Sequence, residues 1–142
     1  ILALEVGLRE VLDTQLGALT GMEARFELHR RAAEAMGAAW AALGLTSLAE
    51  QGAQTAWTLS ALRYPQGVGP ELVGRIKAHG AVVAGGLYPG RKAEYFRVGH
   101  MGYSATRADM LVSTTAAVAH ALAEFKGVDA EAAIQATRAA LS

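Results

Sequence analysis

The sequence predicts an α+β fold in which helices pack on a small, mostly antiparallel sheet of three to four strands. Two observations carry this prediction. Apolar residues recur three and four positions apart in long segments near both ends of the chain, which is the helical period. Between these segments, short runs rich in β-forming residues alternate with glycine and proline turns. The predicted elements follow the order helix, helix, strand, helix, strand, strand, helix, helix.

The first predicted helix covers residues 1–16, where Glu5 and Arg9 lie one turn apart. Its apolar residues lie on two sides: Leu2, Leu4, Val6, Leu8, Val11 and Leu12. We therefore expect other protein surface to cover two faces of this helix. Residues 17–21 begin and end with glycine, and they break the helical pattern.

Residues 22–43 form the second predicted helix, which Gly44 ends. Its predicted buried stripe contains Met22, Phe26, Ala33, Met36, Trp40 and Leu43. Its predicted exposed side contains Glu23, Arg25, Arg30, Arg31 and Glu34. The pattern thus predicts a long helix that packs along one side on the core.

The strands of the sheet are predicted in the middle of the chain. Residues 56–64 mix β-forming residues with an apolar–polar alternation and end at a proline, which is typical of a strand. A short helix over 70–79 begins with proline and is followed by glycine. Residues 81–84 predict a short buried strand, and residues 93–98 predict the next one.

Two further helices complete the prediction. Thr106 or Ser104 can cap a helix that runs to about Lys126. Asp129 is the expected cap of a final helix that ends at Ser142.

A glycine loop and an arginine-bearing strand adjoin in the second half of the chain. Residues 85–90 read Gly-Gly-Leu-Tyr-Pro-Gly, and residues 95–102 read Tyr-Phe-Arg-Val-Gly-His-Met-Gly. Burying Arg97 among these neighbours is costly unless an anion meets it, and a guanidinium binds a carboxylate through two parallel hydrogen bonds. The glycines allow backbone and ligand to approach closely. Arg97 is therefore the candidate carboxylate-binding residue.

The sequence leaves a second role open for the same arginine. Arg97 could form an ordinary salt bridge with Glu71, Glu94 or Asp109, all of which lie within reach in sequence. Spacing alone does not exclude this pairing.

The other polar and aromatic residues of this region are expected to be structural. His100 could donate to a ligand or stay neutral in the wall of the domain, and we favour the second role. Tyr88 and Tyr95 are predicted to be packing residues with one hydrogen-bonded hydroxyl, and Trp40 and Trp57 to be core residues.

Composition limits the function classes. The chain has 142 residues, which fits one domain, and its 13 basic residues balance its 13 acidic ones, so its charge favours neither nucleic acid nor an anionic membrane. It has no cysteine, and its four histidines lack the spacing of a metal site, so we expect no metal. No apolar run approaches the roughly 18 residues of a membrane span. Only 18% of the residues are charged, against about 25% in typical domains, which suggests a partner that covers apolar surface.

Residues 81–122 contain Val-Val-Ala-Gly-Gly-Leu-Tyr-Pro-Gly and Tyr-Phe-Arg-Val-Gly-His-Met-Gly-Tyr-Ser-Ala-Thr-Arg-Ala-Asp-Met. This stretch resembles the C-terminal small domain of the class V, fold-type I aminotransferases, and most closely the alanine–glyoxylate (serine–pyruvate) aminotransferases. Weaker similarity extends back through residues 28–45 and 58–68. The helix at residue 1 resembles the one that precedes the small domain in that family.

The resemblance implies roles for individual residues. Arg97 would bind the α-carboxylate of the amino or keto acid. Gly85, Gly86 and Leu87 match a loop that lines the substrate side of the cleft. No catalytic residue of the family matches a position of this chain.

The resemblance also implies a division of the protein. Residues 1–20 would be an interface and connecting helix, and residues 21–142 the small domain, whereas a cofactor-binding large domain would lie outside this chain. Members of the family are homodimers that use pyridoxal 5′-phosphate, held by a lysine of the large domain. The chain has only Lys77, Lys92 and Lys126, and none matches that context.

The implied activity belongs to the complete enzyme. It would move an amino group between alanine or serine and glyoxylate or pyruvate, whereas this fragment alone would be inactive. The resemblance implies an intracellular protein, peroxisomal or cytosolic. Two alternatives stay open: a stand-alone α+β module that binds a small carboxylic acid without catalysis, and an interaction domain in which the arginine pairs internally.

Overall fold

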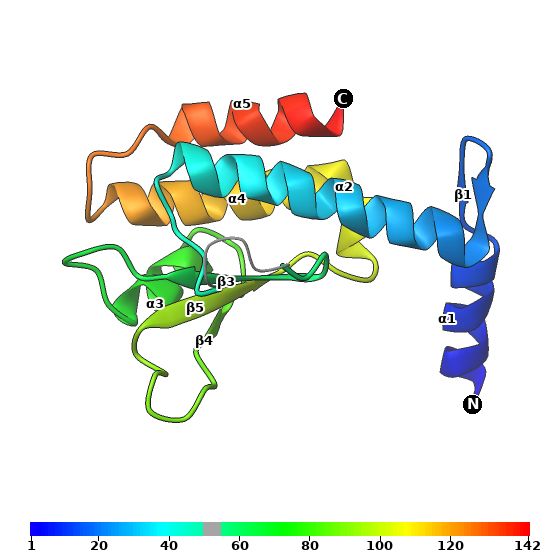
Figure 1. Cartoon of the computed structure of the whole chain (residues 1–142), viewed down its shortest axis with the longest axis horizontal. Coiled ribbons are helices and arrows are strands. Elements are labelled where there is room, and N and C mark those ends of the chain that lie inside the picture. The colour runs from blue at the N-terminus through cyan, green and yellow to red at the C-terminus, as the bar shows by residue number, and fades with distance from the viewer. Residues whose placement is uncertain (50–54) are drawn as a thin grey trace.

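The structure is a computed structural model that describes residues 1–49 and 55–142, and it confirms the predicted α+β class. A layer of helices lies over a small sheet, and a short helix lies beside the sheet (Figure 1). The helical layer consists of α2 (Gly21–Ala42), α4 (Ala108–Ala123) and α5 (Ala130–Leu141). The sheet consists of β3 (Leu59–Arg63), β4 (Ala84–Gly85) and β5 (Tyr95–Gly99), and α3 (Glu71–Ala78) is the short helix.

Strand β5 is the centre of the sheet. The strand order is β3-β5-β4, and both pairings are antiparallel, as predicted. Arg97 of β5 lies opposite Ala61 on one side and Ala84 on the other. Because cross-strand partners point to the same face of a sheet, these three residues share one face.

The predicted buried strand over 81–84 is wrong in its bounds and in its burial. Only Ala84 and Gly85 pair with β5, and Val82 is 86% exposed. The apolar run pairs with the sheet only at its last residue, and of the residues before it Ala81 and Val83 are only partly buried against the core.

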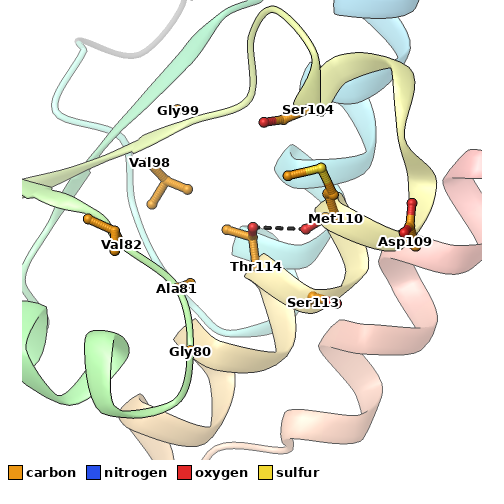
Figure 2. Close-up of a pocket in the computed structure, with 10 residues that line it drawn as sticks. All are labelled: Gly80, Ala81, Val82, Val98, Gly99, Ser104, Asp109, Met110, Ser113 and Thr114. Atoms are coloured by element: carbon orange, nitrogen blue, oxygen red, sulfur yellow. Dashed lines mark hydrogen bonds between the residues drawn. The ribbon is translucent and has the colours of Figure 1, made fainter.

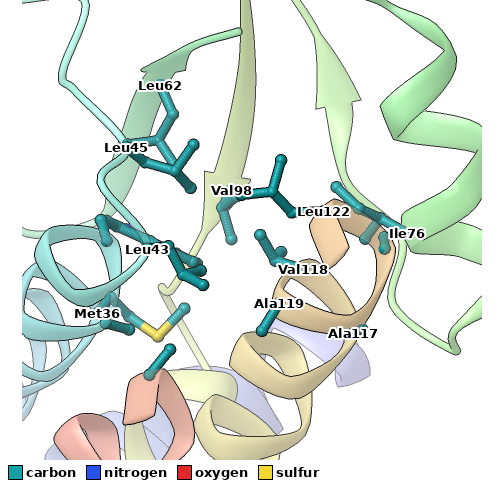
Figure 3. Close-up of a cluster of buried hydrophobic side chains, with 14 of the residues drawn as sticks. Met36, Leu43, Leu45, Leu62, Ile76, Val98, Ala117, Val118, Ala119 and Leu122 are labelled. Atoms are coloured by element: carbon teal, nitrogen blue, oxygen red, sulfur yellow. The ribbon is translucent and has the colours of Figure 1, made fainter. Parts of the chain in front are cut away.

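The hydrophobic core lies between the sheet and the helical layer (Figure 3). Phe96 and Val98 of β5 enter it with exposures of 0% and 1%, and Leu62 of β3 lies beside Phe96. Leu122 and Val118 of α4 face Val98 from the helical layer. Burying a Phe, Leu or Val side chain in this way stabilises the fold by roughly 1.5–3 kcal/mol each.

Helix α2 has the predicted bounds to within one residue, but the predicted burial fails in its first two turns. Met22 and Phe26 are about half exposed, whereas Arg25, expected on the polar side, is only 6% exposed. The start of α2 extends past the other helices toward α1 (Figure 1), where Arg25 binds Glu10 of α1 and Met22 and Phe26 stay exposed. The second half follows the prediction, with Met36 and Trp40 buried. Trp57, also predicted to be a core residue, is 46% exposed, so that prediction is wrong.

The first helix is shorter than predicted, and a hairpin follows it. Helix α1 covers Leu2–Leu12, and β1 (Gln15–Leu16) pairs with β2 (Leu19–Thr20). Gly17 makes the turn possible, since its φ of 59° lies in the left-handed region that favours glycine. No residue of α1 is buried, so the cover predicted for its two apolar sides does not come from the described residues of this chain.

Of the two predicted helix caps, one is confirmed and one is wrong. Asp129 Oδ1 accepts a hydrogen bond of 2.9 Å from the Ala132 amide at the start of α5, as predicted. Helix α4 instead follows a short 3₁₀ turn, η1 (Ser104–Thr106), and has no side-chain cap. The Thr106 hydroxyl donates to the Tyr103 carbonyl and so closes that turn. None of the helices in residues 1–49 and 55–142 is both long and apolar enough to cross a membrane.

Candidate functional site

Arg97 lies on the face of the sheet that points away from the helical layer. Its neighbours Phe96 and Val98 are buried in the core, and side chains alternate between the two faces of a strand. Its cross-strand partners on that face are Ala61 and Ala84, whose methyl groups leave space on both sides of the arginine. The strand therefore presents a single long cation between two small side chains.

The internal salt bridge that the sequence left open for Arg97 does not form among the described residues. Each acidic residue considered has another partner: Glu94 binds Arg91 at 2.6 Å and Arg63 at 3.7 Å, Asp109 binds Arg107 at 2.8 Å, and Glu71 accepts from the Gly69 amide at 2.9 Å. The hydrogen bond from Arg91 lowers the pKa of Glu94, and the hydrogen bond from Arg107 lowers that of Asp109. These carboxylates are thus held as anions by other arginines.

The Arg97 side chain makes one hydrogen bond within the described residues. Its Nε donates to the Gly85 carbonyl oxygen at a distance of 2.9 Å. The terminal nitrogens Nη1 and Nη2 have no partner in the described parts of the chain. A guanidinium bound through Nε keeps both terminal nitrogens directed away from that bond, so this pair can receive a carboxylate end-on.

The glycine loop lies against Tyr95. The Tyr95 hydroxyl accepts hydrogen bonds from the backbone amides of Leu87 at 2.9 Å and Tyr88 at 3.0 Å. These two bonds lower the pKa of Tyr95, since they stabilise its phenolate form, and the nearby Arg97 adds to the effect. The loop and the strand are therefore joined at Tyr95 and at Arg97.

Gly86 is needed for this contact. A Cβ at Gly86 would lie 2.6 Å from the Lys92 carbonyl oxygen and 2.7 Å from Tyr95 Cε1, closer than real Cβ atoms come. A Cβ at Gly85 would meet nothing within 4 Å. Gly86 is thus needed for space, whereas no contact requires glycine at position 85, whose backbone carbonyl oxygen accepts from Arg97.

The structure brings together most of the residues singled out in the sequence. Gly85 contacts Arg97 directly, and Leu87 lies in the adjoining loop with its side chain 63% exposed and its amide bound to Tyr95. The sequence predicted Tyr95 to pack with a hydrogen-bonded hydroxyl but did not predict that this hydroxyl accepts two amides of the glycine loop. The available signal was the spacing of two between Tyr95 and Arg97, which puts both on one face of a strand. The packing role predicted for Tyr88 is wrong, since this residue is 62% exposed.

His100 takes the structural role that was favoured from the sequence. It is 1% exposed, and its Nδ1 donates to the Trp57 carbonyl oxygen at 3.1 Å. The Ser60 hydroxyl therefore donates to Nε2 at 3.0 Å, while its oxygen accepts from Trp40 Nε1 at 2.9 Å. Burial lowers the pKa of His100, so the neutral imidazole fits this network.

Arg97 lines none of three cavities in the described parts of the chain, whose volumes are about 320, 240 and 330 Å³. The first of them lies between the segment before β4, the end of β5 and the start of α4 (Figure 2). Its lining includes Val98, which points to the opposite face of β5 from Arg97. A pocket around Arg97 would therefore need a second wall from outside these residues.

The chain does not fit a pyridoxal 5′-phosphate site of its own. Such a site needs an amine in an enclosed position, and Lys77 and Lys92 are exposed while Lys126 is only partly buried. None of the three lysines lines the cavities described above. We therefore assign no cofactor contact to these residues.

No family model matches the chain. It is 30% identical over 115 residues to alanine–glyoxylate aminotransferase 1 of Saccharomyces cerevisiae, a match that covers 72% of this chain and 25% of that protein. The crystal structure of ureidoglycine–glyoxylate aminotransferase from Bacillus subtilis matches with 27% identity and a TM-score of 0.76, over 85% of this chain and 31% of that one. Pyridoxamine–pyruvate aminotransferase from Mesorhizobium loti matches with 26% identity and a TM-score of 0.80, over 99% and 33%. The chain thus spans a quarter to a third of these relatives.

Replacing the two glycines separately tests the contact between loop and strand. We expect Gly86→Ala to lower the free energy of unfolding by about 1–3 kcal/mol, because the new methyl group overlaps Tyr95 and Lys92. Gly85→Ala is the matched control and should change it by less than about 0.5 kcal/mol. Urea unfolding of both variants checks this, and equal losses would contradict the steric account.

The neutral state of His100 predicts an acid-sensitive stability. Its pKa in the folded state lies below the ordinary value of 6.5, so the unfolded state binds more protons as the pH falls below that value. The free energy of unfolding should therefore be highest above about pH 6.5 and fall on acidification. Unfolding of wild type and His100→Gln at pH 7.5 and 5.5 measures the effect. The variant should lose less stability between the two pH values, and an equal loss would exclude His100 as a source.

Proposed function

Because this chain is a relative of the class V aminotransferases, we propose that it forms the C-terminal part of such an enzyme and supplies the arginine that binds the substrate carboxylate. The observation that carries this proposal is the state of Arg97. Its terminal nitrogens have no partner in the described residues, and the acidic side chains within reach in sequence are bound elsewhere. An anion from outside the chain would complete its hydrogen bonding.

The names of the relatives support a carboxylate as that anion. Each names glyoxylate or pyruvate, which are 2-oxo acids with a carboxylate beside the reacting carbonyl. The amino donors differ more widely, and one of them, pyridoxamine, has no carboxylate. The shared chemical group is therefore the carboxylate of the 2-oxo acid, and we assign Arg97 to it. For this chain we propose alanine or serine as amino donor and glyoxylate or pyruvate as acceptor.

In this proposal Arg97 binds and orients, and it makes no bond to a reacting atom. Two parallel hydrogen bonds from Nη1 and Nη2 fix the plane of the carboxylate, which fixes where the adjacent carbon lies. The alanines beside the arginine leave room for the rest of a small substrate. Pyridoxal 5′-phosphate would supply the amino-group transfer, bound by parts of the enzyme that this chain does not cover, so the chain by itself would be inactive.

We further propose that residues 1–20 form a connecting and interface segment and residues 21–142 the small domain of a homodimeric enzyme. Helix α1 has no buried residue and carries exposed apolar side chains. Surface of this kind favours contact with further protein. The relative from Mesorhizobium loti matches over 99% of this chain, which takes in this helix.

Substitution of Arg97 in the complete enzyme tests the assignment. We expect Arg97→Ala to lower kcat/KM for alanine and pyruvate by at least about thirty-fold, because a desolvated charge-assisted pair is lost. Binding of the cofactor should stay nearly unchanged. Arg63→Ala is the control, since Arg63 lies on the same face of the sheet but pairs with Glu94. An equal loss with amines that lack a carboxylate would contradict the role of Arg97.

The alternative of a stand-alone carboxylate-binding module makes a different prediction for the chain alone. The open surface around Arg97 suggests only weak binding, because the second wall of the pocket is missing. Calorimetric titration of the 142-residue chain with glyoxylate, pyruvate and alanine should therefore give little or no heat of binding. Micromolar affinity would favour the module over the enzyme fragment.

A further inference from the structure

One tyrosine side chain contacts three consecutive residues of the glycine loop. Tyr95 is 5% exposed and begins β5. Its hydroxyl accepts from the amides of Leu87 and Tyr88, and its ring lies where a side chain at Gly86 would have to be. The phenol oxygen can accept both bonds, which hold two consecutive amides of the loop at the same atom. The loop is therefore shaped around this side chain.

Gly85, the residue before this contact, provides the hydrogen-bond acceptor for Arg97. The Gly85 carbonyl oxygen accepts from Arg97 Nε, and Gly85 is bonded directly to Gly86. Two glycines in succession give this backbone wide conformational freedom, and neither has a side chain that could pack to restrict it. Gly85 ends β4 and pairs with Phe96 of β5, so the sheet holds the chain on one side of its carbonyl oxygen. On the other side the chain enters the loop, and the group that fixes the loop is Tyr95.

A fixed position of the Gly85 carbonyl oxygen also fixes the orientation of the Arg97 guanidinium. The group is planar, so a hydrogen bond at Nε sets the direction of Nη1 and Nη2. Without that bond the exposed part of Arg97 can rotate among its rotamers, and each binding event has to restrict them again. A fixed acceptor at Gly85 therefore lowers the entropy lost when an anion binds.

We propose that Tyr95 is a positioning residue for the substrate carboxylate: it holds residues 86–88 in place, and through Gly85 it orients the terminal nitrogens of Arg97. This inference rests on the proposed function, since it assumes that Arg97 binds the carboxylate. It goes beyond the sequence prediction for Tyr95, a packing residue with one hydrogen-bonded hydroxyl, because the hydroxyl is here required to place the loop.

The chain offers a matched control for removal of the hydroxyl. Tyr95→Phe keeps the ring and removes only the acceptor of the two amides. Tyr64→Phe removes another tyrosine hydroxyl beside the same sheet, but that hydroxyl is buried without a partner in the described residues. The Tyr64 ring stacks on Phe96 and takes no part in the loop.

Hydrogen exchange in the complete enzyme tests the first half of the proposal without any activity. In Tyr95→Phe the amides of Leu87 and Tyr88 should exchange about tenfold faster, while those of α2 and α4 keep their wild-type rates and show that the protein is folded. Tyr64→Phe should leave the Leu87 and Tyr88 rates unchanged. Unchanged rates in Tyr95→Phe, or an equal increase in both variants, would overturn the proposal.

A double-mutant cycle tests the second half. Tyr95→Phe should raise KM for pyruvate and alanine about two- to tenfold with kcat nearly constant, because orientation of the arginine affects binding. In an Arg97→Ala background the same substitution should leave KM unchanged, since there is no guanidinium left to orient. An equal rise in both backgrounds would show that Tyr95 acts on the fold alone and would overturn the proposal.

A different experimental result would contradict the proposed function. If Arg97→Ala itself leaves KM for carboxylate substrates unchanged, the proposed function and this inference are both wrong. If Arg97→Ala raises KM strongly and Tyr95→Phe does not, the proposed function stands and only the role of Tyr95 is wrong.

Discussion

Strand β5 is constrained on both sides and on both faces, and the rest of the structure depends on that constraint. It pairs with β3 along one edge and with β4 along the other. Phe96 and Val98 enter the core, so Tyr95 and Arg97 have to lie on the opposite face. A shift of one residue in register would turn a guanidinium into the core and Phe96 out of it, which is strongly unfavourable. The packing of the core therefore decides where the candidate site faces.

The candidate site forms one wall of a pocket and not a complete pocket. Arg97 lies between Ala61 and Ala84 in the sheet and is bound through Nε to the Gly85 carbonyl, while its two terminal nitrogens have no partner in the described residues. The neutral network around His100 supports the other face of the same sheet. This division fits a chain that spans a quarter to a third of its relatives, since our proposal assigns the reactive chemistry to the part that this chain does not cover.

The sequence predicted those features that depend on local patterns. Asp129 caps α5 because an N-cap needs only the three residues that follow it, and Arg97 stood out because its neighbours are apolar or glycine. The sequence did not predict features that depend on contacts between residues far apart in the chain. Arg25 is buried because its guanidinium lies between Glu10 of α1 and the Gly102 carbonyl oxygen, contacts that the helical period does not show. The two amide bonds of Tyr95 depend on the path of a loop that periodicity does not describe.

The most direct test of the central claim is the structure of the complete enzyme with bound pyruvate. The account predicts that the two carboxylate oxygens lie about 2.7–3.2 Å from Nη1 and Nη2 of Arg97, while Nε still donates to the Gly85 carbonyl oxygen. A carboxylate bound by other residues would contradict it. So would a glutamate or aspartate of the enzyme that occupies both terminal nitrogens in place of the substrate.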